Sequence, residues 1–176
     1  MDFVQILVDA ADRLAAVSTQ LVLVMAGVGG IALIILYLSG QAGRTRRGQR
    51  TDAAGSFVAV ILLGCCLISL ESLVNAGAHQ FGFGAVTFDA IAYVPESRYG
   101  PAARAVNAGL TLLQTVGWAF IFNGLLRLRR AQKDGHTGLS RGDDITSGVK
   151  RFFCGLLLVC NPSVLAALQN TFKLHW

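Results

Sequence analysis

The stretch that decides the fold is QLVLVMAGVGGIALIILYLS, residues Gln20 to Ser39. It contains no charged residue, and a helix of this length, at about 1.5 Å per residue, matches the ~30 Å hydrocarbon core of a bilayer. The run is followed by a cluster of arginines: Arg44, Arg46, Arg47 and Arg50. Because short loops rich in Lys and Arg stay in the cytoplasm, the sequence predicts a membrane-spanning helix whose C-terminal end faces the cytoplasm.

The composition of the whole chain is typical of a membrane protein. Of its 176 residues, 53% are hydrophobic and only 14% are charged, whereas a soluble domain has about 25% charged residues. The mean hydropathy is +0.56. We expect one membrane domain, because the chain is too short to add a folded soluble module. The net charge is +5, and most of the cationic residues lie in two loops beside apolar runs. Their role in orienting the protein in the membrane explains this placement better than a nucleic-acid-binding groove does.

Three further apolar runs are long enough to cross the bilayer. They are residues 56–75, 105–126 and 149–171. With 20–39 they predict an all-α integral membrane protein with four transmembrane helices. The order of elements repeats along the chain, so the helices are expected to form two tandem hairpins of the same orientation, like the parallel repeats of some transporters.

The segments between these runs differ in charge. Loops 40–55 and 127–148 are polar and basic, whereas 76–104 is rich in aromatic residues, glycine and proline. Four cationic residues lie in 40–55 and seven in 127–151, against two in the outer loop. This bias predicts that the basic loops are cytoplasmic and that both termini and the outer loop are periplasmic. One short helix is expected near 85–92.

The first nineteen residues have apolar positions at three- and four-residue spacings, with acidic residues and Arg13 on the opposite side. The pattern predicts an amphipathic helix, which either lies on the membrane surface or packs against a neighbouring subunit. A secretory signal peptide begins with a positive segment, whereas this chain begins Met-Asp. The N-terminus is therefore expected to be retained.

Small and polar residues within the runs mark the expected helix contacts. Ala26, Gly27 and Gly30 form a small strip that permits close approach of another helix, whereas Ile35 is expected to face lipid. In the third run Gln114 lies on a polar face that should turn toward other helices, with a channel lining as the alternative. In the fourth, Asn161-Pro162 predicts a kink, and Asn161 is expected to bond the carbonyl that proline frees.

Glu71 is a charge inside the second run, near its outer end. Its depth favours a structural partner, Arg104 or Arg98, over a proton relay. The cysteines Cys65, Cys66, Cys154 and Cys160 show neither metal-ligand spacing nor the exposed placement of a disulfide scaffold. We expect free thiols in packing roles, and a Cys66–Cys160 disulfide is the alternative.

No catalytic pair, metal motif, phosphate loop or dinucleotide fingerprint occurs in the sequence, so no enzymatic activity and no cofactor are expected. Function is expected to come from self-assembly into a homo-oligomer. The basic residues of the two inner loops are predicted to contact phospholipid headgroups, and transported nucleic acid is a further partner that needs no sequence recognition. These residues are Arg44, Arg46, Arg47, Arg50, Arg127, Arg129 and Arg130.

The span LVLVMAGVGGIALIILYLSG, after Val17-Ser18-Thr19-Gln20 and before the basic loop, resembles small integral membrane proteins of type IVB conjugation and secretion systems. The layout is similar to that of the TraQ-like proteins of IncI-type conjugation systems, which group with IcmC/DotE-like components. The resemblance implies a non-enzymatic inner-membrane protein that acts with other membrane components in DNA transfer. Conjugative pilins also have paired apolar helices joined by a basic loop, so a subunit extracted into an extracellular pilus is one alternative. A small transporter or channel is another.

Overall fold

The computed structural model describes residues 3–49, 54–86, 91–132 and 138–173, and within these ranges the regular structure is helical, without a strand. The helices are α1 (Phe3–Arg46), α2 (Ala54–Ile68), α3 (Leu70–Gln80), α4 (Glu96–Tyr99), α5 (Pro101–Arg130), α6 (Gly138–Val159) and α7 (Asn161–Phe172). Val8–Arg46 and Pro101–Arg130 are each long and apolar enough to cross a membrane. Two bent helix pairs raise the number of candidate spans to as many as four. These are the helices of a membrane protein.

Helix α1 joins two segments that the sequence pattern predicts as separate helices. The sequence predicts an amphipathic helix over residues 1–19 and a separate span over 20–39, but Phe3–Arg46 is one helix of 44 residues. No proline lies between the two segments, so nothing interrupts the helical hydrogen bonds at their junction. At about 1.5 Å per residue α1 is roughly 66 Å long, more than twice the hydrocarbon thickness. Part of α1 must therefore lie outside the lipid core.

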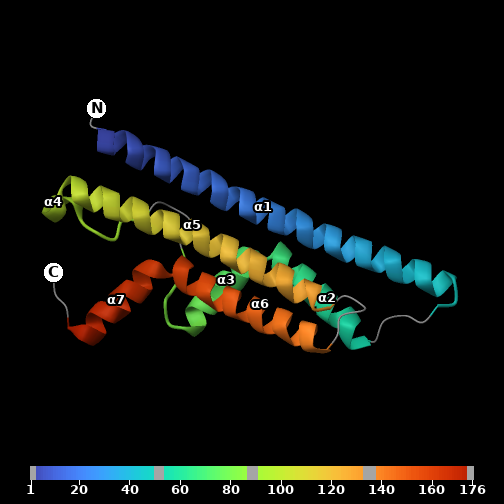
Figure 1. The fold of residues 1–176 in the computed structure, drawn as a ribbon. Helices are drawn as coiled ribbons and strands as arrows, with labels where there is room; N and C mark the ends of the chain where they lie inside the picture. The colour runs from blue at the N-terminus through green and yellow to red at the C-terminus, as the bar shows by residue number, and fades with distance from the viewer. Residues whose placement is uncertain (1–2, 50–53, 87–90, 133–137, 174–176) are drawn as a thin grey trace.

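Helices α1 and α5 lie side by side and run in the same direction, as Figure 1 shows. Their basic last turns, which contain Arg44 and Arg46 in α1 and Arg127, Arg129 and Arg130 in α5, therefore point toward the same end of the molecule. Helix α2 returns along α1, and α6 returns along α5. The buried core lies among these helices and includes Leu67, Trp118 and Ile121.

Each returning helix is bent. The axes of α6 and α7 differ by 77° at Cys160, which confirms the kink predicted at Asn161-Pro162. The axes of α2 and α3 differ by 90° at Ser69, a bend that no sequence pattern predicted. The Ser69 hydroxyl donates a 2.8 Å hydrogen bond to the Cys65 carbonyl, a contact of the kind that bends helices.

The outer loop is held by polar side chains of the helices. Asn107 accepts a hydrogen bond from the Val94 amide at 2.9 Å and donates one to the Val94 carbonyl at 3.0 Å. The Thr111 hydroxyl accepts from the Ile91 amide at 3.1 Å. These bonds pair backbone amide and carbonyl groups of the loop, which form no hydrogen bonds within a helix. The short helix expected at 85–92 is wrong for residues 85, 86, 91 and 92, while 87–90 lie outside the described residues; the short helix is α4.

Candidate functional site

Glycines bring α5 and α6 into backbone contact. A Cβ atom added at Gly117 would lie 2.8 Å from the carbonyl oxygen of Gly155, and one at Gly124 would lie 2.8 Å from that of Gly148. Real Cβ atoms do not approach oxygen so closely. Helices without a hydrophobic force between them gain from such close packing, so these glycines determine the α5–α6 contact.

The small strip of α1 makes the corresponding contact with α2. Ala26 is completely buried, and a Cβ atom at Gly30 would lie 2.7 Å from the Gly64 carbonyl oxygen. A Cβ atom at Gly27 would meet nothing within 4 Å. Ala26 and Gly30 therefore lie at a contact within the chain, whereas Gly27 lies beside it.

The two helix pairs use equivalent contacts. A side chain at Gly30 would meet Gly64 and Ile68, and a side chain at Gly117 would meet Gly155 and Val159. On the other side of each contact, Gly64 faces Ile34 and Gly155 faces Ile121. The bend of each returning helix then follows its glycine at the same separation, Ser69 after Gly64 and Cys160 after Gly155. The α1–α2 and α5–α6 pairs are thus built on the same packing arrangement.

The predicted headgroup-contacting arginines lie at helix ends. Arg44, Arg46 and Arg47 are exposed, and Arg50 lies outside the described residues. Arg127 and Arg129 are half-buried, whereas Arg130 is exposed. Arg127 also donates a 2.9 Å hydrogen bond to the Ser147 hydroxyl, which ties the end of α5 to α6.

The ion pair expected between Glu71 and Arg104 is wrong. The Arg104 guanidinium instead pairs with the Glu96 carboxylate at 3.0 Å, because α4 ends next to the first turn of α5. Glu71 is exposed in the first turn of α3, where a negative charge is favourable at a helix N-terminus. The other expected partner, the Arg98 side chain, lies outside the described residues.

Asn161 has a different partner from the one predicted. Its side-chain amide donates a 2.8 Å hydrogen bond to the Leu110 carbonyl of α5, rather than to its own helix, and the residue is buried. The bend at Cys160 places it at the start of α7, so that it ties α7 to α5. All four cysteines are free thiols, so the alternative Cys66–Cys160 disulfide is wrong.

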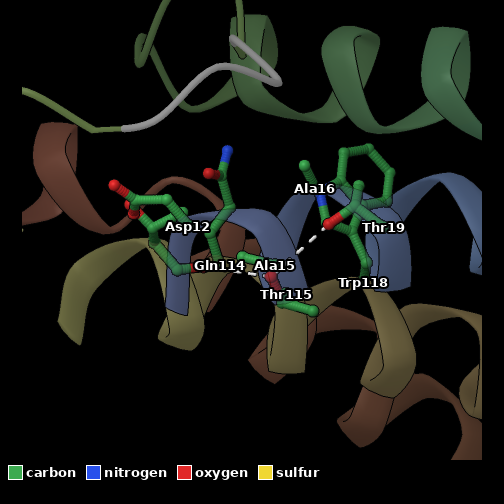
Figure 2. Close-up of a pocket in the computed structure, with 8 residues that line it drawn as sticks. Asp12, Ala15, Ala16, Thr19, Gln114, Thr115 and Trp118 are labelled. Atoms are coloured by element: carbon green, nitrogen blue, oxygen red, sulfur yellow. Dashed lines mark hydrogen bonds between the residues drawn. The ribbon is translucent and has the colours of Figure 1, made fainter. Parts of the chain in front are cut away.

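A small polar cavity lies between α1 and α5. Its volume is about 20 Å³, and Figure 2 shows the side chains that converge on it. The Thr19 and Thr115 hydroxyl oxygens lie 3.4 Å apart across it. Gln114 lines it and is buried, so the polar face predicted for this helix turns toward α1. The lining residues are Asp12, Ala15, Ala16, Thr19, Thr111, Gln114, Thr115 and Trp118.

Asp12 and Thr19 were not singled out from the sequence. The sequence places Asp12 on the polar side of an amphipathic helix, and it did not predict the continuity of α1 or its packing on α5. A usable signal was present: Asp12, Ala15, Ala16 and Thr19 have the spacing of one helix face, and three of them are small enough to let another helix approach.

A wider cleft of about 410 Å³ adjoins the cavity, and Asp12 lines both. The cleft also contains Asp9, Glu96 and Arg104. Since Arg104 is paired with Glu96, the charges of Asp9 and Asp12 remain, and the cleft is acidic. Across the described ranges, no group of three or more His, Cys, Asp and Glu side chains is arranged to hold a metal ion.

No family model, curated protein or solved structure matches this chain.

Proposed function

We propose that this chain is a non-enzymatic structural subunit of a membrane assembly and that it binds further copies of itself through the exposed face of α1. The observation that supports this most directly is a row of apolar side chains on α1, spaced alternately three and four residues apart. We call this row the α1 seam. Its members are 42% to 65% exposed: Leu14, Val17, Leu21, Val24, Val28, Ile31, Ile35 and Leu38.

The spacing of the seam favours another helix as its partner. Apolar residues that alternate at three and four positions keep facing a partner helix when the two wind around each other with a left-handed supercoil. The buried residues Ala15, Thr19, Ala26 and Leu33 occupy the opposite side of α1. The seam is therefore unoccupied by the α1–α2 and α1–α5 contacts within the described part of the chain.

The length of the seam favours a protein partner over lipid. It begins at Leu14 and Val17, which precede the uncharged run Gln20–Ser39 and are 65% and 63% exposed. Because α1 is longer than the hydrocarbon core is thick, lipid chains do not cover its whole length. If the α1 helices of two copies lie parallel with their seams facing each other, each seam covers the other along the uncharged run and also at Leu14 and Val17. This proposal replaces the expectation that Ile35 faces lipid.

The role that we propose for the assembly is based on the resemblance of the sequence to small membrane proteins of type IVB conjugation and secretion systems. We propose a component of a type IVB-like conjugative DNA-transfer or secretion apparatus in a bacterial inner membrane, with α1–α3 and α5–α7 as two tandem hairpins. In this arrangement the basic ends of α1 and α5 face the cytoplasm and contact phospholipid headgroups. The equivalent glycine contacts of the two helix pairs support the tandem arrangement.

Cysteine cross-linking tests the seam with two neighbouring residues. In a cysteine-free background, Ile35→Cys is expected to give disulfide-linked dimers on mild oxidation in native membranes, since Ile35 would lie opposite its own copy. Leu36→Cys is the matched control: its exposure is 65% against 59% for Ile35, but it lies off the seam. We expect at least a fivefold higher dimer yield for Ile35→Cys. Equal yields would contradict assembly through this face.

A further inference from the structure

Asp12 is a carboxylate that forms no ion pair with any side chain in the described part of the chain. Its Oδ1 atom is buried between α1 and α5 and has no hydrogen-bond partner within the described residues. Burying a carboxylate oxygen without a partner costs free energy, because the oxygen loses its hydrogen bonds to water and gains none from the protein. Arg104, the cation that lines the adjoining cleft, is paired with Glu96. A positive ligand at Asp12 would remove this cost.

The groups around Asp12 favour a hard cation. Gln114, Thr19 and Thr115 line the same cavity, and their amide and hydroxyl oxygens are the ligand type that such cations bind. The volume of about 20 Å³ exceeds the roughly 10–15 Å³ that one water molecule needs, so a single unhydrated ion of that size fits. One carboxylate balances one positive charge, which favours a monovalent over a divalent ion.

The adjoining cleft gives a hydrated ion a route to Asp12. It is about 410 Å³ in volume, and because Arg104 is paired with Glu96, the remaining charge of Asp9 raises the local concentration of cations. Because Asp12 lines both spaces, an ion that enters the cleft meets the carboxylate first and can then exchange water for the oxygens of the inner cavity.

From this arrangement we propose that α1 and α5 form a binding site for a monovalent metal cation, Na⁺ or an ion of similar size, with Asp12 as its anionic ligand. Thr19 on α1 and Gln114 and Thr115 on α5 supply neutral oxygens. Since ligands come from both helices, the bound ion holds the first half of α1 against α5. The site is independent of the α1 seam and does not rest on the proposed function.

Trp118 lines the cavity and reports on it by fluorescence. The chain has two tryptophans, so Trp176→Phe leaves Trp118 as the single reporter. We expect Na⁺, titrated against choline at pH 8 and constant ionic strength, to give a saturable change in emission from detergent-solubilised protein. Asp12→Asn, which keeps the side-chain shape but removes the charge, should weaken binding at least tenfold. Asp143→Asn, on α6 and away from both spaces, should leave it unchanged.

Direct binding of radioactive ²²Na⁺ to the purified wild-type protein provides a second measurement that does not depend on a variant. One ion bound per chain, displaced by unlabelled Na⁺ but not by choline, is the expected result. The absence of saturable ²²Na⁺ binding by the wild type would overturn the proposal. So would an Asp12→Asn variant that elutes normally on gel filtration and binds Na⁺ as the wild type does.

Discussion

Replacing Gly117 by leucine is expected to separate α5 from α6 and to lower the free energy of unfolding by about 3 kcal/mol. The new Cβ atom would lie 2.8 Å from the Gly155 carbonyl oxygen and 2.8 Å from the Val159 amide nitrogen. Both are backbone atoms, so the clash cannot be relieved by a change of rotamer. The two helices must move apart, and their close packing is lost along the contact.

Gly109→Leu on the same helix is the matched control, because a Cβ atom at Gly109 would meet nothing within 4 Å. It should leave stability unchanged or raise it by up to about 1 kcal/mol, since glycine is a poor helix former. Unfolding by SDS in mixed micelles, followed by circular dichroism, measures both variants. If Gly117→Leu were as stable as Gly109→Leu, the backbone contact would not be a determinant of the fold.

Replacing Gly30 by leucine is expected to have a similarly large effect on the α1–α2 pair, with a loss of about 3 kcal/mol. The added Cβ would lie 2.7 Å from the Gly64 carbonyl oxygen and 3.0 Å from the Ile68 amide nitrogen. Ile35→Ala should cost far less in the fold of one chain, because Ile35 is 59% exposed. Thermal unfolding in the Trp176→Phe background, followed by Trp118 emission, compares them, since Trp118 is 1% exposed when the core is intact.

Gly27→Leu separates the effect of contact from that of a larger residue in the same helix. Nothing lies within 4 Å of a Cβ atom at Gly27, so this variant should melt close to the wild type. A Gly27→Leu variant as unstable as Gly30→Leu would show that α1 tolerates no larger side chain in this region. The specific contact with Gly64 would then not account for the result.

The sequence predicted the helical class and the presence of membrane-spanning helices. An uncharged apolar run whose helical length matches the thickness of a bilayer is typical of such helices. Pro162 predicted the bend near Cys160, since proline removes a backbone donor. The bend at Ser69 was not predictable, because many serines bond the preceding turn without such a change of direction. The continuity of α1 was missed because its polar start and apolar centre differ in composition while sharing one helical register.

The contact role of Gly30 could be predicted from small-residue spacing, but the partner could not. Gly64, Gly117 and Gly155 look like ordinary membrane-helix glycines until the helices are paired, because pairing depends on residues far apart in the sequence. The same limit applies to the polar cavity. Gln114 was expected to face another helix, yet only the alignment of α1 with α5 brings Asp12 and Thr19 to it.

If the chain assembles with copies of itself in the membrane, the mass of the released protein will be a multiple of the mass of one chain. Native mass spectrometry of the protein released from lipid vesicles, without exchange into harsh detergent, measures this mass. We predict species at multiples of the 18.7 kDa chain, with phospholipid retained. A lipid-free species of 18.7 kDa at every protein concentration would contradict the claim.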